Sequence, residues 1–240
     1  MNIEEINNNI NDILNGKRDL PQFNQPEHAG VCSAGPLLIG ALIVCNYTRE
    51  SLSASGDASS CKGASPSNWQ IDEAQEKAVE QWVGTQGVWV PEAEQWLTEN
   101  YGQMVAQGAE AKVYYKTGDT HVVKSRTSIY ATLERALEAV ALHNALFPET
   151  IMRVIGFTRD DDGLFRILLT QPYIECLRLA TKQEIDNMVE AKGFTDNGDG
   201  NGVNYISERL HLEDMHPVNV FVESLTGKPI CIDCIVKFKR

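Results

Sequence analysis

Residues 211–236, HLEDMHPVNVFVESLTGKPICIDCIV, combine acidic and amide side chains with a strand-like apolar pattern. Apolar residues alternate from Val218 to Val222, residues 225–229 have the composition of a tight turn, and a second apolar run leads to Asp233. Alternation on both sides of a Gly and Pro turn is typical of two paired strands. We therefore expect a loop, a strand, a turn and a second strand.

This hairpin has a chemical consequence. It brings Asn219, at the start of one strand, close to Asp233, at the end of the other. Because amide and carboxylate oxygens are ligands of Mg²⁺, the two side chains can share a divalent cation. Asp214 lies five residues before Asn219 on the preceding loop. A carboxylate at this place is positioned to take the proton of a hydroxyl group that reacts next to the cation. This is the pattern that a phosphotransferase needs, because phosphoryl transfer requires a positioned metal, positioned phosphates and an aligned acceptor.

The order of these residues resembles the protein kinase superfamily, in which a catalytic loop H-R-D-x-x-x-x-N precedes a metal-binding D-F-G. Here residues 212–219 read LEDMHPVN and residues 232–235 read IDCI. The His-Pro pair before Asn219 is similar to the D-x-H-P-x-N of small-molecule and atypical kinases. Leu212 replaces the H-R-D histidine and Asp-Cys-Ile replaces D-F-G, which weakens the case for protein substrates more than the case for the superfamily.

Residues 103–124 predict an earlier hairpin, with Thr117-Gly118-Asp119 as its turn. In the superfamily this region holds the glycine-rich loop, G-x-G-x-x-G-x-V, and the strand lysine. Gly108 stands at the middle glycine, small residues stand at the other two, and Val113 stands at the valine. The resemblance implies that the backbone approaches phosphates here and that Lys124 contacts them.

A predicted helix from about residue 128 to residue 146 carries Glu134 and Glu138 one turn apart. In the superfamily a helix glutamate pairs with the strand lysine. The resemblance therefore implies that Glu138 holds Lys124, with Glu134 as the alternative. The other interpretation is two solvated surface charges, because most helix glutamates are exposed.

Residues 151–170 predict a further hairpin around Asp160-Asp161-Asp162-Gly163, since Asp and Gly tolerate the backbone of a turn. The acidic triplet is therefore interpreted as structural. The chain then passes through Gln171 and Tyr173. By resemblance these residues stand at the hinge, where backbone groups meet the adenine, and only their positions are carried over.

The first hundred residues predict a mainly helical region. Apolar residues recur at helical spacing in residues 3–14, and further helices begin near Ile71 and Pro91. The apolar segment 34–44 is interpreted as a buried helix or a buried strand. The Ser- and Gly-rich residues 51–67 predict an exposed loop. We expect residues 1–100 to form this region and residues 101–240 to form the kinase-like core.

Composition excludes several classes of protein. A formal net charge of −12 argues against a broad nucleic-acid surface. The acidic N-terminus lacks the apolar region of a secretory signal, and the apolar run near residue 40 is too short to span a membrane. Six scattered cysteines indicate a reducing compartment, so we expect a cytoplasmic protein of bacterial or phage origin.

Three other motifs compete with this interpretation. The first is a calcium-loop pattern, with a Gly- and Asn-rich surface turn as its alternative. Cys231 and Cys234 form a C-x-x-C, but a structural zinc needs four ligands and no second pair is present, so core packing explains them better. Cys32 lacks the local signatures of a thiol hydrolase. The calcium-loop positions are Asn197, Asp199, Asn201, Gly202 and Glu208.

Together the motifs predict an α+β, protein kinase-like fold with an antiparallel N-lobe sheet, one N-lobe helix, a reduced C-lobe and an N-terminal, mainly helical extension. The chain is most similar to the kinase-like domains of polyvalent proteins of phages and mobile elements. This resemblance implies a phosphotransferase that uses ATP and Mg²⁺ on a hydroxyl-bearing protein or small molecule. The alternative is a catalytically silent module that binds a nucleotide or a partner. Because seven residues follow Asp233, we expect that residues 1–100 supply the missing mass, that the natural chain is longer, or that this is a reduced kinase.

Overall fold

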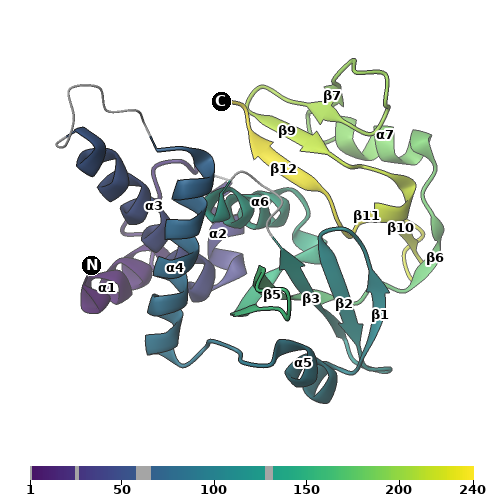
Figure 1. Cartoon of the computed structure of the whole chain (residues 1–240). Coiled ribbons are helices and arrows are strands. Elements are labelled where there is room, and N and C mark those ends of the chain that lie inside the picture. Colours follow the sequence, from purple (N-terminus) through teal and green to yellow (C-terminus); the bar gives the residue numbers. More distant parts are fainter. Residues whose placement is uncertain (1, 25–26, 58–65, 128–131) are drawn as a thin grey trace.

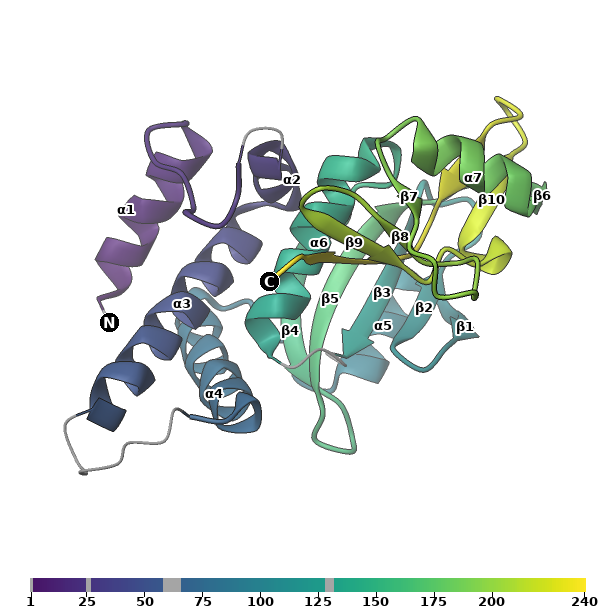
Figure 2. The ribbon, with the colours of Figure 1, turned by 90° about the horizontal axis from the view of Figure 1, so that it is seen from above.

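The computed structural model describes residues 2–24, 27–57, 66–127 and 132–240, with the first four helices on one side and three antiparallel sheets on the other (Figure 1). Helix α6 lies between these two parts, as the view from above shows (Figure 2). The predicted mixed α and β class is confirmed. The helices are α1 (Ile3–Leu14), α2 (Glu27–Ala34), α3 (Pro36–Asp57), α4 (Asn68–Gln86), α5 (Ala93–Tyr101), α6 (Leu133–Leu146) and α7 (Lys182–Glu190), with 3-10 turns at Pro148–Thr150 and Pro217–Asn219.

The three sheets have the strand orders β1-β2-β3-β5-β4, β11-β10-β6 and β12-β9-β8-β7. The hairpin predicted from residues 211–236 is confirmed, because β10 pairs antiparallel with β11. The strands are β1 (Gln103–Gln107), β2 (Ala111–Tyr115), β3 (His121–Thr127), β4 (Arg153–Arg159), β5 (Phe165–Pro172), β6 (Cys176–Leu179), β7 (Thr195–Asp196), β8 (Tyr205–Ile206), β9 (Leu210–Glu213), β10 (Val220–Glu223), β11 (Pro229–Cys231) and β12 (Ile235–Phe238).

The first sheet has two chemically different faces because successive side chains of a strand point in opposite directions. Tyr114 of β2 and Val123 of β3 are buried together with Leu97 of α5 on one face. Lys124 and Arg126 of β3 point the other way, toward the C-terminal strands. The alternating sequence of β3 therefore directs two cations into the space between the sheet and the C-terminal hairpin.

Helix α3 is longer than the sequence predicted. Residues 51–57, which we expected in an exposed loop, continue the helix. The Ser53 hydroxyl donates to the Arg49 carbonyl oxygen at 3.0 Å, so this serine is accommodated within the helix. Residues 58–65 of the expected loop lie outside the described residues.

A single hydrophobic core joins the N-terminal helices to the rest of the chain. It contains Ile10 of α1, Leu42 of α3, Leu137 of α6, Ile167 of β5 and Val236 of β12. Helix α6 thus packs against the helices on one side and the C-terminal strands on the other. The N-terminal helices help to position α6 because they share its core.

Within the part of the chain that the structure describes, no single helix is long and apolar enough to cross a membrane. Helix α2 and residues 36–54 of α3 pass the same test of length and composition only when taken together, and they meet at an angle of 110°. Apolar residues of this pair, such as Val31, Leu38 and Leu42, are buried in the core.

An ion pair links the C-terminal segment to α6. Nη2 of Arg240 donates to the Glu138 carboxylate at 2.7 and 3.0 Å. Burial raises the pKa of Glu138 to about 7, against the opposing effect of the Arg240 charge. Glu138 is therefore partly protonated near neutral pH.

The raised pKa of Glu138 predicts a pH-dependent stability. Between its ordinary value of 4.5 and about 7, the folded chain holds a proton that the unfolded chain releases. The free energy of unfolding therefore falls as pH rises through this window. In the wild type this fall is on the order of 2–3 kcal/mol, and Glu138→Gln should remove it. Denaturant titrations at several pH values across the window measure the free energy of unfolding of both proteins. Glu5→Gln, at an exposed position of α1, is the control, and identical profiles for wild type and Glu138→Gln would contradict the prediction.

The contact between α2 and α6 predicts a strong effect at one glycine. A Cβ atom at Gly30 would overlap the carbonyl oxygen of Ala141 and lie 2.7 Å from the nitrogen of Ala145. Because these are backbone atoms, Gly30→Ala should lower the free energy of unfolding by about 2–4 kcal/mol. Gly84→Ala in α4 meets nothing within 4 Å and should raise it by up to about 1 kcal/mol. Thermal and chemical denaturation measure both variants. Equal changes in the free energy of unfolding for Gly30→Ala and Gly84→Ala would refute the proposed close packing.

Candidate active site

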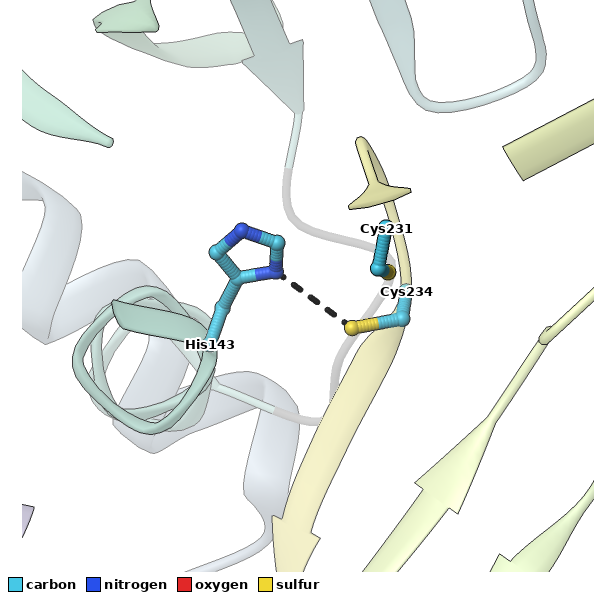
Figure 3. A group of neighbouring side chains, drawn as sticks. All are labelled: His143, Cys231 and Cys234. Carbon is cyan, nitrogen blue, oxygen red and sulfur yellow. Dashed lines mark hydrogen bonds between the residues drawn. The ribbon is translucent and has the colours of Figure 1, made fainter. Parts of the chain in front are cut away.

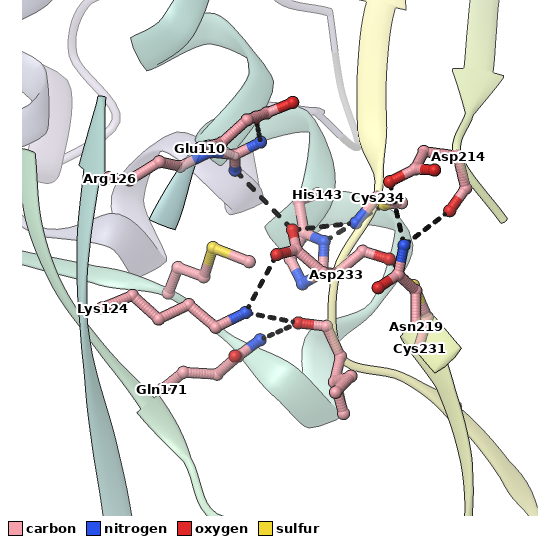
Figure 4. Close-up of polar contacts among 12 residues, drawn as sticks. Glu110, Lys124, Arg126, His143, Gln171, Asp214, Asn219, Cys231, Asp233 and Cys234 are labelled. Carbon is pink, nitrogen blue, oxygen red and sulfur yellow. Dashed lines mark hydrogen bonds and ion pairs between the residues drawn. The ribbon is translucent and has the colours of Figure 1, made fainter. Parts of the chain in front are cut away.

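The carboxylate of Asp233 is the centre of the candidate site (Figure 4). Nζ of Lys124 donates to its Oδ2 at 3.3 Å and to the Ile232 carbonyl oxygen at 2.8 Å. Nη1 of Arg126 lies 3.8 Å from its Oδ1. Burial alone raises the pKa of Asp233, but the charges of Lys124 and then Arg126 outweigh it and lower the pKa to about 2. Asp233 is therefore ionised at neutral pH and faces two buried cations.

Asn219 connects the two acidic residues. Its Nδ2 donates to the carbonyl oxygen and to Oδ2 of Asp214, both at 2.9 Å. The main-chain carbonyl oxygen of Asn219 accepts a hydrogen bond from the N–H of Ile232, the residue before Asp233, at 2.9 Å. The structure thus brings Asp214, Asn219 and Asp233 together, as the hairpin predicted.

Asp214 has an unusual backbone conformation. Its φ is 63°, in the left-handed region that residues other than glycine seldom adopt. The N–H of Asp214 donates to Oδ1 of Asn204 at 3.2 Å, and this contact helps to hold the turn. The Asp214 side chain remains 47% exposed, so its carboxylate is accessible to an acceptor molecule.

A pocket of about 230 Å³ opens beside these groups and beneath the turn between β1 and β2. Gly108 closes this turn by donating its N–H to the Ala111 carbonyl oxygen at 2.8 Å. Gly108 and Val113 therefore lie beside the acidic groups, as the resemblance implied. The lining residues are Gly108, Ala109, Glu110, Ala111, Val113, Arg126, Asp214, Asn219, Asp233, Cys234 and Ile235.

Arg126 belongs to this site, although the sequence analysis did not select it. Its Nη2 lies 3.0 Å from Oε2 of Glu110, so it joins the β1–β2 turn to Asp233. Arg126 is only 5% exposed. It follows Lys124 by two residues on β3, and the period of two that places strand residues on one face was the signal for it.

The ion pair expected between Lys124 and Glu138 is replaced by other contacts. Glu138 pairs with Arg240, and the alternative residue, Glu134, pairs with Arg49 at 3.0 Å. Lys124 pairs with Asp233 instead. The reason is the position of α6: its two glutamates meet cations from α3 and from the C-terminal end.

The two hinge positions differ in their surroundings. Gln171 is 2% exposed, and its Nε2 donates to the carbonyl oxygens of Thr150 and Ile232, both at 3.0 Å. Tyr173 is half-exposed and stacks on Tyr115, with ring centroids 4.5 Å apart. The side chain of Gln171 therefore supports the same carbonyl group as Lys124, while Tyr173 lies in an aromatic pair at the edge of the sheet.

The donors around the pocket suit a hard divalent cation. Because Nδ2 of Asn219 makes both hydrogen bonds to Asp214, its Oδ1 is directed away from that residue. Asp233 supplies an ionised carboxylate. Such oxygen donors fit Mg²⁺, which takes one or two protein ligands and completes its shell with water and phosphate oxygens.

The calcium-loop pattern covers the turn between β7 and β8, strand β8 and the start of the next turn, where Glu208 lies, so it is not flanked by two helices. Asp199 accepts hydrogen bonds from the side chains of Asn204 at 2.6 Å and Asn197 at 3.0 Å. These bonds, with that from Asn204 the larger cause, lower the pKa of Asp199 to about 2. The acidic oxygens are thus used to shape a surface turn.

Cys32 lies beside a histidine that the sequence did not identify. Its Sγ is 3.5 Å from Nε2 of His28, and Nδ1 of His28 is 3.6 Å from Asp19. Burial, with a smaller effect from Asp19, raises the pKa of the Cys32 thiol. A nucleophilic cysteine requires the opposite shift, so the structure does not favour a thiol hydrolase.

Comparison with known proteins identifies a family for this chain. A search of curated proteins finds no match. The sequence does match the family described as the serine/threonine/tyrosine kinase found in polyvalent proteins, over residues 72–240. This match includes most of α4, all of α5 and the sheets, and it covers more than half of the chain. The chain therefore belongs to the kinase family of polyvalent proteins.

Proposed function

We propose that this protein is an ATP- and Mg²⁺-dependent phosphotransferase that moves the γ-phosphoryl group to a hydroxyl acceptor. The observation that carries the proposal is the convergence of one strand and one hairpin on a single polar site. Lys124 comes from β3, whereas Asp214, Asn219 and Asp233 come from the loops around β10 and β11. Membership of the kinase family supports this chemistry.

Asp214 is the residue suited to the acceptor. Its carboxylate is accessible at the pocket, and Asn219 holds its Oδ2 at 2.9 Å. In the proposed reaction Asp214 accepts the hydroxyl proton while the hydroxyl oxygen bonds to the γ-phosphorus. The bond from that phosphorus to the bridging oxygen breaks, and ADP leaves with the electron pair.

The cations and the oxygen donors serve the phosphates. Lys124 and Arg126 are each 5% exposed and present two positive charges near Asp233. Such charges stabilise anionic phosphoryl oxygens most strongly where water is excluded. Asn219 and Asp233 would hold Mg²⁺, which when bound neutralises charge on the phosphates. Gly108, in the turn above, has no Cβ, and the space that a Cβ would take is open except for the Ala111 carbonyl oxygen at 3.9 Å, so phosphates can come close to the backbone there.

A catalytically silent module that binds a nucleotide or a partner protein is the second candidate. The observation in its favour is that Lys124 pairs with Asp233 and not with a glutamate of α6. If the ligand of the silent module is ATP, both candidates bind it in the same pocket. They then differ in one result: the active enzyme transfers the γ-phosphate, whereas the silent module leaves ATP intact.

The first prediction tests nucleotide binding. Magnesium ATP should raise the melting temperature of the wild type, because a ligand at about 100 times its Kd stabilises the native state by about 2.7 kcal/mol. Asp233→Asn keeps the side-chain shape, removes the charge and should lose most of this gain. Asp199→Asn, in the exposed β7–β8 turn, is the matched control and should keep it. A shift with calcium alone, and none with magnesium ATP, would refute the proposal.

The second prediction tests transfer. Asp214→Asn should lower the rate at which the γ-phosphoryl group of ATP is transferred to water or to the chain itself. The expected loss is roughly 10²–10⁴-fold, since a general base contributes this much. Its affinity for magnesium ATP should change little, because Asp214 meets the acceptor. Radiolabelled γ-phosphate and equilibrium binding measure the two quantities separately. Equal turnover in both proteins would exclude the role of Asp214, and binding without turnover in the wild type would favour the silent module.

A further inference from the structure

Three side chains with soft metal-binding atoms meet behind the candidate active site (Figure 3). His143 comes from α6, and Cys231 and Cys234 come from the two ends of the C-x-x-C segment. Their ligand atoms all lie within 4.8 Å of one another, and all three residues are at most 2% exposed. The sequence showed the two cysteines but gave no further ligand, because His143 lies 88 residues before Cys231 and approaches it only in the folded chain.

The hydrogen bonds of His143 direct one ring nitrogen toward the thiols. Nε2 lies 3.2 Å from the carbonyl oxygen of Thr150 and 3.2 Å from its hydroxyl oxygen. That hydroxyl donates to the Cys231 carbonyl oxygen at 2.7 Å, so both Thr150 oxygens are acceptors toward His143. In the neutral imidazole the proton therefore lies on Nε2, and the lone pair of Nδ1 points to Sγ of Cys234, 3.4 Å away. Metal-bound histidines show the same arrangement, with the second nitrogen donating to a carbonyl group.

The distance between the His143 nitrogen and the Cys234 sulfur fits a tetrahedral ion. With zinc bonds of about 2.0–2.3 Å, a nitrogen and a sulfur ligand lie about 3.6 Å apart and two sulfurs about 3.8 Å apart. The distance from Nδ1 of His143 to Sγ of Cys234 is 3.4 Å. The thioether of Met215, which is fully buried, lies 3.9 Å from Sγ of Cys231 and lines another side of the cluster.

We propose that His143, Cys231 and Cys234 supply three of the four ligands of one Zn²⁺ ion, with the buried thioether of Met215, 3.9 Å from Sγ of Cys231, as the candidate for the fourth. The charge favours zinc over the monovalent copper ion, which also prefers sulfur ligands. Two thiolates and a neutral imidazole balance the two charges of Zn²⁺, whereas Cu⁺ would leave a net negative charge buried beside Asp233. Binding releases two protons, one from each thiol, and oxidises no group.

The proposed ion would fasten α6 to the segment that carries Asp233. Cys231 and Cys234 lie on either side of residues 232 and 233, and Lys124 contacts both of these residues. The zinc site is independent of the proposed transfer reaction, since its ligands are defined by the fold alone. It adjoins the Mg²⁺ site, because Cys234 also lines that pocket and its N–H donates to Oδ1 of Asp233 at 3.0 Å, but the donors to Mg²⁺ are oxygens.

The test begins with the full-length chain, purified without chelators. Elemental analysis should find about one zinc ion per chain. After removal of the zinc, Co²⁺ should bind with thiolate-to-cobalt absorption bands and release two protons, and Zn²⁺ should displace it. Cys231→Ser and Cys234→Ser should each abolish these bands, whereas Cys45→Ser, a buried cysteine of α3, should keep them.

The wild-type titration decides the proposal even if the serine variants fail to fold. Absence of both zinc and a thiolate–cobalt band from the folded wild type would overturn it, leaving a buried cluster of hydrogen-bonded thiols. Retention of the band in Cys231→Ser and Cys234→Ser would also overturn it. Uptake of Cu⁺ under reducing conditions, with no uptake of Zn²⁺ or Co²⁺, would refute the assignment to zinc.

Discussion

The ionised carboxylate of Asp233, enclosed by Lys124 and Arg126, is the constraint on which the site depends. The Asp233 side chain is 30% exposed, and a partly buried carboxylate is costly unless cations and hydrogen bonds surround it. Lys124 meets this requirement and also holds the Ile232 carbonyl oxygen at 2.8 Å. The first sheet and the C-terminal hairpin are therefore joined at the point where the phosphate chemistry is proposed.

Helix α6 and the N-terminal helices support this junction because they share one hydrophobic core with the C-terminal strands. Helix α6 is packed between α2, α3 and the C-terminal strand β12, and its polar side chains face defined partners. Glu134 meets Arg49, Glu138 meets Arg240, and His143 meets Cys234 and Thr150. The N-terminal helices are thus part of the framework that supports the site.

The sequence predicted the features that depend on local pattern. The alternation around β10 and β11 and the order of Asp214, Asn219 and Asp233 were sufficient to place these residues together. Arg126 was missed, although its spacing from Lys124 contained the signal. The partners of Glu138 and His143 could not be predicted, because Arg240 and Cys234 are about 100 and 91 residues away and meet these side chains only through packing.

The central claim is that Asn219 and Asp233 hold a divalent cation against the phosphates of ATP. Crystals grown with Mn²⁺ and a non-hydrolysable ATP analogue test this claim most directly, because Mn²⁺ scatters anomalously and takes similar oxygen ligands to Mg²⁺. We predict an anomalous peak between Oδ1 of Asn219 and the Asp233 carboxylate, with the γ-phosphate beside Asp214. A peak at another place, or a nucleotide bound outside this pocket, would contradict the account.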